Sequence, residues 1–183
     1  MVNLSTRDRH PRGPSQGRAR TAGCLVATLM VALTLARADV RVGDPFPVLS
    51  AADLVGSPPP PTAGKVVLVD FWASWCAPCR ASFPAYAKLD DRMAEKGLVI
   101  VAVSVDDDPA AYRSFVSKWA PPFYTALDAH HQLVSRVGVP SMPTSFLLDR
   151  SGRVRWMSVG YHGSSTDKAL QSEIETLLNE KTP

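Results

Sequence analysis

The sequence has few cysteines, few histidines and no long hydrophobic run. Its 183 residues include 3 cysteines and 4 histidines, so a scaffold held together by several disulfides is excluded. No uncharged apolar stretch reaches the roughly 18 residues that a confident membrane span requires. Hydrophobic residues make up 45% and charged residues 20% of the chain. This composition is typical of a globular domain with a buried core and excludes global disorder.

The main part of the chain also lacks an excess of positive charge. The net charge is +3, but residues 1–38 contain six arginines and one acidic residue. The remaining residues carry 14 basic and 16 acidic side chains, so we expect no nucleic-acid partner. The glycines are scattered rather than clustered. We therefore expect no nucleotide, haem or flavin cofactor.

Residues 1–38 are predicted to be a secretory signal peptide. An arginine-rich stretch precedes a 15-residue uncharged segment, residues 22–36, and the A-x-A pattern of a cleavage site follows at Ala36 to Ala38. Cleavage before Asp39 predicts a periplasmic or secreted protein. The alternative is retention of the segment as an uncleaved membrane anchor, which is then the chain's one association with a membrane.

The rest of the chain is predicted to form an irregular lead-in followed by one α/β domain. The lead-in, residues 39–63, contains a proline-rich loop, and the domain spans residues 64–181. Buried, β-branched runs predict strands, and apolar residues at helical spacing predict helices. The predicted strands are 66–72, 98–105, 123–127, 144–148 and one from 154, and the predicted helices are 76–97, 109–119, 130–137 and one capped by Ser164. This order predicts a mixed central sheet with helices on both faces.

Cys76 and Cys79 stand where a buried strand gives way to a helix. The unpaired N–H groups of a helix N-terminus favour negative charge, so we expect Cys76 to be the attacking thiolate. Cys79 lies one turn further on, where we expect it to be more buried and to resolve the mixed disulfide. Such a redox-active disulfide works without another cofactor.

Two other uses of the cysteine pair are disfavoured. An inert pair is one of them. A structural zinc site is the other, because zinc takes four ligands and the three histidines outside the predicted signal show no paired spacing. We therefore predict no metal site. The acidic run Asp106 to Asp108 is interpreted as a solvated turn with a helix cap, not as a cation site.

Three segments resemble the landmarks of the thioredoxin superfamily. Residues 69–80, VDFWASWCAPCR, resemble its active-site segment, residues 138–144, GVPSMPT, its cis-proline loop, and residues 146–152, FLLDRSG, the hairpin that follows. The lead-in, the long insertion after the second strand and the export signal are similar to the TlpA/ResA-like family of periplasmic thiol-disulfide oxidoreductases. The resemblance implies a thioredoxin-like fold over about residues 43–180.

The resemblance also implies a buried acid beneath the dithiol. Asp70 matches that position, where a carboxyl with a raised pKa would exchange a proton with Cys79. A purely local hydrogen-bonding role for Asp70 is the alternative. The lysine that pairs with this acid in thioredoxin has no counterpart in residues 98–105.

On the substrate side, the resemblance implies four binding residues. Pro143 is expected to be cis, with Met142 presenting its backbone to a substrate strand and Thr144 completing the motif. Trp75 is expected to shield the dithiol and contact the substrate. The implied substrates are protein disulfides, including those of apocytochrome c or copper-site proteins, and the implied electron donor is a membrane thiol reductase of the DsbD or CcdA type.

Three functions remain open for this dithiol. Reduction is favoured because Ala77-Pro78 contains no histidine of the kind found in strong oxidants. A disulfide oxidase or isomerase on the same fold is the first alternative. A Cu(I)-binding metallochaperone is the second, since soft thiolates suit that ion.

Overall fold

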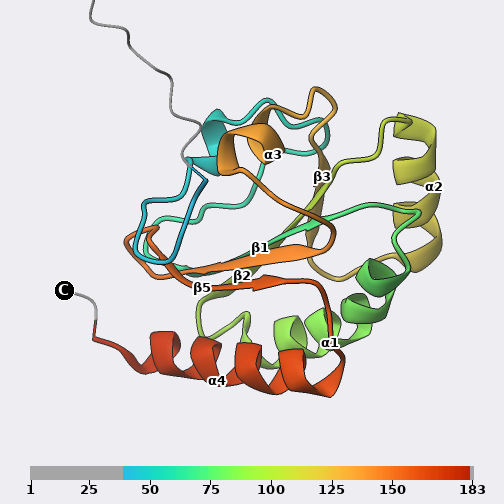
Figure 1. The fold of residues 1–183 in the computed structure, drawn as a ribbon. Coiled ribbons are helices and arrows are strands. Elements are labelled where there is room, and N and C mark those ends of the chain that lie inside the picture. The colour runs from blue at the N-terminus through green and yellow to red at the C-terminus, as the bar shows by residue number, and fades with distance from the viewer. Residues whose placement is uncertain (1–38, 182–183) are drawn as a thin grey trace, which may run out of the picture. The chain divides into compact units, whose positions relative to one another are not determined.

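In a computed structural model of the chain, residues 39–181 are described, and the predicted signal peptide, residues 1–38, lies outside them. The centre is a five-stranded mixed sheet in the order β3-β2-β1-β4-β5 (Figure 1). The strands are β1 (Val66–Trp72), β2 (Leu98–Ser104), β3 (Tyr124–Leu127), β4 (Thr144–Leu148) and β5 (Val154–Val159). The helices are η1 (Leu49–Ala51), α1 (Ala77–Met93), α2 (Pro109–Trp119), α3 (Gln132–Val137) and α4 (Ser164–Asn179).

Strand β1 is the middle of the sheet, and all seven of its residues are buried. It pairs in parallel with β2 and antiparallel with β4. A largely apolar run that includes three valines suits this position because both of its faces are covered. The chain then turns through β4 and β5 as the predicted antiparallel hairpin. The expected mixed sheet is confirmed.

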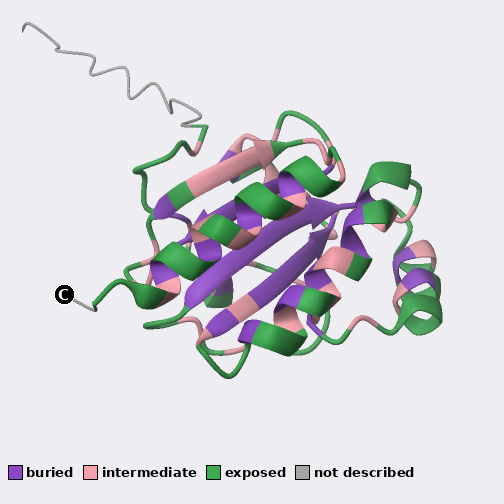
Figure 2. Cartoon of the chain, turned by 90° about the horizontal axis from the view of Figure 1, so that it is seen from below, coloured by how far each residue is buried: buried purple, intermediate pink, exposed green. Residues whose placement is uncertain are grey.

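The two faces of β1 enter two different cores. Leu68 and Trp72 pack with buried residues of α1, α2 and α4. Val69 and Phe71, which point the other way, pack with α3 and with the lead-in. Figure 1 shows α1 and α4 on one side of the sheet and α3 on the other. Figure 2, seen from the α1 and α4 side, shows both helices lying over the buried strands with their exposed residues outward. The predicted helices on both faces are confirmed.

Helix boundaries differ from the predictions in four places. Helix α1 begins at Ala77 and not at Cys76, and α3 begins at Gln132 and not at residue 130. The first helix ends at Met93 and not at Gly97. Gly97 lies in the turn after the helix and has a left-handed φ of 106°. The last helix begins at Ser164, and its cap position is Gly163, so Ser164 is not the cap. Helix α2 starts as predicted, with the Asp108 side chain accepting a hydrogen bond from the Ala110 N–H at 2.8 Å. No helix within residues 39–181 is both long and apolar enough to cross a membrane.

Candidate active site

The dithiol lies at the N-terminus of α1, just after the end of β1. Cys76 is the cap residue of the helix, and Pro78 stands in its first turn, where a missing N–H does no harm. Cys76 and Cys79 form a disulfide, with their Cα atoms 5.3 Å apart. The Cys79 N–H donates a hydrogen bond to Cys76 Sγ at 3.2 Å. This amide, together with the helix dipole, would stabilise negative charge on Cys76 once the disulfide opens.

Burial around the dithiol is uneven. Cys79 is completely buried and Cys76 is 4% exposed, whereas Trp75, the residue before them, is 67% exposed. A large aromatic ring in water beside a reactive pair is available to another protein. Shielding of the dithiol and substrate contact by Trp75 stay predictions.

The second landmark lies at the same end of the sheet. The Met142–Pro143 peptide bond is cis, as expected from the resemblance. Thr144 pairs in register with Phe71 of β1, so the preceding Met142 and Pro143 lie where β1 ends and the dithiol loop begins. Thr144 is buried and its hydroxyl donates to the Ser141 carbonyl at 2.7 Å. The structure therefore brings this loop and the dithiol to one edge of the sheet.

Asp70 is completely buried on the α1 side of β1. Its Oδ1 accepts hydrogen bonds from the Ser145 hydroxyl at 2.6 Å and the Tyr86 hydroxyl at 3.0 Å. Its Oδ2 is buried and has no hydrogen-bond partner among the described residues. Burial raises the pKa of Asp70 from 3.8 to about 7, and the bonds from Ser145 and Tyr86 oppose that rise. The hydrogen bonds of the local role are thus present, and proton exchange with Cys79 stays a proposal.

The prediction of a solvated acidic turn was wrong for Asp106. This residue is 2% exposed, and both of its carboxylate oxygens lie 3.1 Å from the Ser74 N–H. The hydroxyls of Ser74 and Ser104 donate to it at 2.8 and 2.7 Å. A carboxylate can be buried where donors surround it. Here Ser104, at the end of β2, and Ser74, in the loop after β1, supply them. Asp107 does extend into solvent, with its side chain 94% exposed.

Ser74 is held from a second side by α1. Arg80, one turn into the helix, donates from Nη1 to the Ser74 carbonyl at 2.9 Å. The peptide before Trp75 and Cys76 is therefore fixed through its N–H, its carbonyl and its side chain. Neither Asp106 nor Arg80 was among the predicted site residues. The available signal was a serine that precedes the cysteines and an acid that follows a buried strand.

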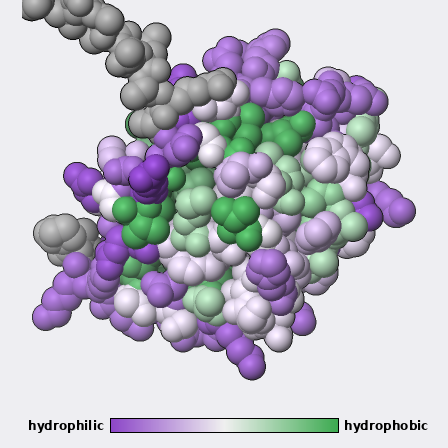
Figure 3. All heavy atoms as spheres, viewed as in Figure 1, coloured by the Kyte–Doolittle hydropathy of each residue, from purple (hydrophilic) through white to green (hydrophobic). Residues whose placement is uncertain are grey.

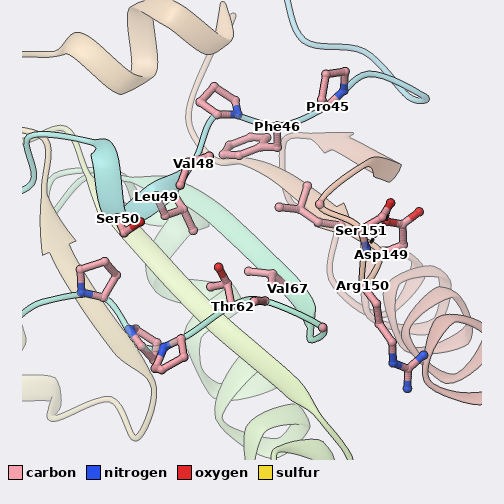
Figure 4. Close-up of a pocket in the computed structure, with 18 residues that line it drawn as sticks. Pro45, Phe46, Val48, Leu49, Ser50, Thr62, Val67, Asp149, Arg150 and Ser151 are labelled. Carbon is pink, nitrogen blue, oxygen red and sulfur yellow. Dashed lines mark hydrogen bonds between the residues drawn. The ribbon is translucent and has the colours of Figure 1, made fainter. Parts of the chain in front are cut away.

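A groove elsewhere in the domain does not belong to this site. It has a volume of about 680 Å³ and is lined by residues of the proline-rich lead-in, by Val67 and by the turn at Asp149 to Gly152. Val67 lies near the start of β1, whereas the dithiol follows its end. Figure 4 shows the Arg150 guanidinium pointing away from the groove, and it donates to the Leu177 carbonyl of α4 at 2.6 Å.

Hydrophobic residues of the lead-in also reach the surface. Val42, Val48 and Val55 are all at least half exposed. Figure 3 shows one face of the molecule, on which the hydrophobic residues form several small patches separated by polar residues. Within residues 39–181, no cluster of three or more His, Cys, Asp or Glu side chains could hold a metal ion.

Comparison with known proteins places the chain in a family. A family model described as Redoxin matches residues 41–174. The chain belongs to the redoxin family. This redoxin is 32% identical to the thiol-disulfide oxidoreductase ResA of Bacillus thuringiensis (strain Al Hakam) over 120 residues. These residues cover 66% of the chain and 65% of ResA. The chain thus matches somewhat less than two thirds of that relative's length.

Other relatives agree with the fold and with the TlpA/ResA-like resemblance. ResA of Geobacillus thermodenitrificans is 29% identical over 140 residues, which cover 75% of this redoxin and 79% of that protein. A crystal structure from Chlorobium tepidum, assigned as thiol:disulfide interchange protein DsbE, is 33% identical with a TM-score of 0.67. It covers 76% of this redoxin and 99% of the other chain. The predicted thioredoxin-like fold and the predicted resemblance to the TlpA/ResA-like family are confirmed.

Proposed function

We propose that this redoxin is a thiol-disulfide oxidoreductase that reduces disulfides in other proteins. The observation that carries the proposal is the Cys76–Cys79 disulfide at the N-terminus of α1. The cis-proline loop at the same sheet edge and the names of the similar proteins support it. Trp75, Met142, Pro143 and Thr144 are the residues we propose for substrate binding.

In the first step, the reduced enzyme attacks its substrate. The Cys76 thiolate displaces one sulfur of the substrate disulfide and forms a mixed disulfide with the other. The substrate S–S bond breaks, and the departing thiolate takes a proton from water. The Cys79 N–H and the start of α1 stabilise the Cys76 thiolate before the attack.

In the second step, Cys79 resolves the mixed disulfide. Its thiol gives a proton to the Asp70 carboxylate, and the resulting thiolate attacks Cys76 Sγ. The bond between Cys76 and the substrate breaks, and the second substrate thiolate leaves and takes a proton from water. Two electrons have then passed from the dithiol to the substrate, and the enzyme is in the disulfide form that the structure contains.

A reductase in an oxidising compartment needs electrons from elsewhere. Export through residues 1–38, to the periplasm or the medium, is part of the proposal, as is recharging by a membrane thiol reductase of the DsbD or CcdA type. Apocytochrome c and copper-site proteins are the proposed substrate classes. Their cysteines must be reduced before haem or metal is attached.

The reduction potential of the Cys76–Cys79 pair tests the direction. We would equilibrate the purified protein in dithiothreitol and glutathione buffers and measure the fraction oxidised. A value at or below about −220 mV, in the range of glutaredoxin and thioredoxin, is the expected result. A value above about −160 mV would overturn the reductase proposal and make Cys76 a disulfide donor.

Trapping tests the roles of the two cysteines. Cys79→Ser should retain attack but lose resolution, so the variant should accumulate a mixed disulfide with a reducible substrate such as insulin. Cys76→Ser is the matched control, because it keeps a single cysteine in the pair but removes the attacking sulfur. Equal trapping by the two variants would contradict the assigned order. Tight Cu(I) binding without disulfide exchange would instead favour a metallochaperone.

A further inference from the structure

Asp70 presents two very different oxygens. Both hydroxyl donors, Ser145 and Tyr86, approach Oδ1, and Oδ2 is buried without a partner among residues 39–181. The two hydroxyls also lie 3.0 Å from each other. Because Oδ1 is occupied by donors, Oδ2 is the oxygen that has room to accept a proton.

The two donors come from the elements that carry the rest of the active site. Ser145 lies in β4 as the direct register partner of Asp70, two residues after cis-Pro143. Tyr86 lies in α1, seven residues after Cys79 and therefore on the same helix face. Cys79 and Tyr86 share one buried core cluster. The acid is thus tied to both landmarks of the site.

The hydrogen bonds at each oxygen of Asp70 affect the balance between its ionised and its protonated form. A hydroxyl that donates to a carboxylate makes a charge-assisted bond, which is about twice as strong as a bond to a neutral carboxyl. Tyr86 and Ser145 therefore favour the ionised form through Oδ1. Negative charge on Oδ2 has no such support and is costly in a dry core. The two oxygens oppose each other, which leaves Asp70 able to take up and release a proton near neutral pH.

We propose that Tyr86 and Ser145 are positioning residues, which occupy Oδ1 of Asp70 so that the proton from Cys79 arrives on Oδ2 and stays there while the disulfide is closed. The inference rests on the proposed function, because it assigns the route of the proton in the resolution step. The proton balance is simple: Cys79 Sγ loses the proton and Oδ2 gains it. Recharging of the dithiol by the electron donor returns it.

In the oxidised protein, no charged side chain among residues 39–181 is a cause of the raised pKa of Asp70. Burial and the two hydroxyls are the causes that act on the Asp70 carboxyl. The facing residue of β2 is Ala102, and the buried residues that α4 adds to this core are Leu170, Ile174 and Leu177. A change in either hydroxyl should therefore appear directly in the titration of Asp70.

The first test is the titration of Asp70 in the oxidised protein, followed by the carboxyl ¹³C shift of labelled aspartate and assigned with Asp70→Asn. Tyr86→Phe and Ser145→Ala should each raise the midpoint by about 1 pH unit, since each removes a charge-assisted donor. Tyr112→Phe is the matched control. It removes another buried tyrosine hydroxyl, which lies 3.1 Å from Thr125 Oγ1, and should leave the midpoint in place. An unchanged midpoint in both test variants overturns the proposal.

The second test locates the proton by infrared difference spectroscopy of the oxidised protein. With the proton on Oδ2, Oδ1 is the carbonyl oxygen and accepts two hydrogen bonds. Its C=O stretch should then move to higher wavenumber in Tyr86→Phe, which has one donor fewer. If the proton sits on Oδ1, the bare Oδ2 is the carbonyl, the stretch does not respond to Tyr86→Phe, and the proposal fails.

Neither spectroscopic measurement needs turnover. Failure of this inference can therefore be distinguished from failure of the proposed function. An oxidising potential would overturn the reductase and leave both spectroscopic results standing. A normal reductase with an unresponsive Asp70 would overturn the positioning roles alone. In a stopped-flow measurement of mixed-disulfide resolution, the pH at half-maximal rate should also rise in Tyr86→Phe. A pH profile identical to that of Tyr112→Phe contradicts the proposal.

Discussion

Two buried aspartates, Asp70 in β1 and Asp106 just after β2, differ sharply in their surroundings. Asp106 follows β2, and both of its oxygens accept hydrogen bonds. The donors are the N–H and the hydroxyl of Ser74 and the hydroxyl of Ser104. Asp70 in β1 has two hydroxyl donors on one oxygen and none on the other. Burial raises the pKa of Asp70 to about 7. Both acids are buried. What distinguishes them is the distribution of hydrogen-bond donors over their two oxygens.

Asp128, a third buried acid, supports this distinction. It accepts the Gln132 N–H on Oδ1 at 3.0 Å and the Val134 N–H on Oδ2 at 2.8 Å, at the start of α3. Acids whose two oxygens both meet donors hold loops and helix ends in place. An acid with one bare oxygen can bind a proton instead. The comparison therefore separates two carboxylates with donors on both oxygens from Asp70, which has donors on one oxygen only.

The largest expected effect is the loss of a pH-dependent penalty in Asp70→Asn. The pKa of Asp70 is 3.8 in the unfolded chain and about 7 when folded. Between these values the folded state keeps a proton that the unfolded chain has lost, so stability falls as pH rises, by about 4 kcal/mol in total. Above pH 7 the penalty is constant. Urea unfolding of the oxidised protein from pH 4 to pH 8 should show this loss in the wild type and not in Asp70→Asn.

The control for that measurement is Asp106→Asn, which should keep the full pH-dependent fall due to Asp70. Parallel stability profiles for wild type and Asp70→Asn would contradict the assignment of Asp70 as the proton-binding acid.

The next effect is a loss of stability in Asp106→Asn. The amide nitrogen would replace an oxygen that faces only donors from Ser74 and Ser104. An N–H group facing other donors leaves buried polar groups unpaired, and we expect the free energy of unfolding to fall by about 3 kcal/mol. Urea denaturation at pH 7 measures it. A change below about 1 kcal/mol would show that these bonds do not hold the loop.

A smaller effect is expected for Ser74→Ala. This variant keeps the Ser74 N–H bonds to Asp106 but loses the hydroxyl bond at 2.8 Å. We expect a loss of about 1 kcal/mol in the free energy of unfolding. In a double-mutant cycle with Asp106→Asn, the two losses should be less than additive because they share one interaction. Strict additivity would place the two residues in separate networks.

The smallest effect sharpens the comparison between sequence neighbours. Asp107 is adjacent to Asp106, but its side chain lies almost wholly in solvent. Asp107→Asn should change the free energy of unfolding by less than about 0.5 kcal/mol. The same urea experiment at pH 7 measures it. A loss as large as that of Asp106→Asn would mean that charge at this turn, not hydrogen bonding to Ser74, is what stabilises it.

Much of the fold could be predicted because its signals are local. The largely apolar run of β1 and the cap at Asp108 follow from side-chain chemistry and from the backbone groups of a helix start. Helix ends were less certain, as the misplaced cap at Ser164 shows. Competing residues at neighbouring positions differ little in local energy, so packing selects the boundary.

The sequence by itself predicted the cysteine pair and the elements that present it. Two cysteines between a buried strand and a helix predict a dithiol at a helix N-terminus, and the structure has one. Only the tertiary structure decided which donors each buried acid meets. Asp70 meets Ser145 and Tyr86, and Asp106 meets Ser74, across 16 to 75 residues of sequence. Such contacts depend on strand register and helix placement, which no local pattern records, and they set how many donors each carboxylate oxygen meets.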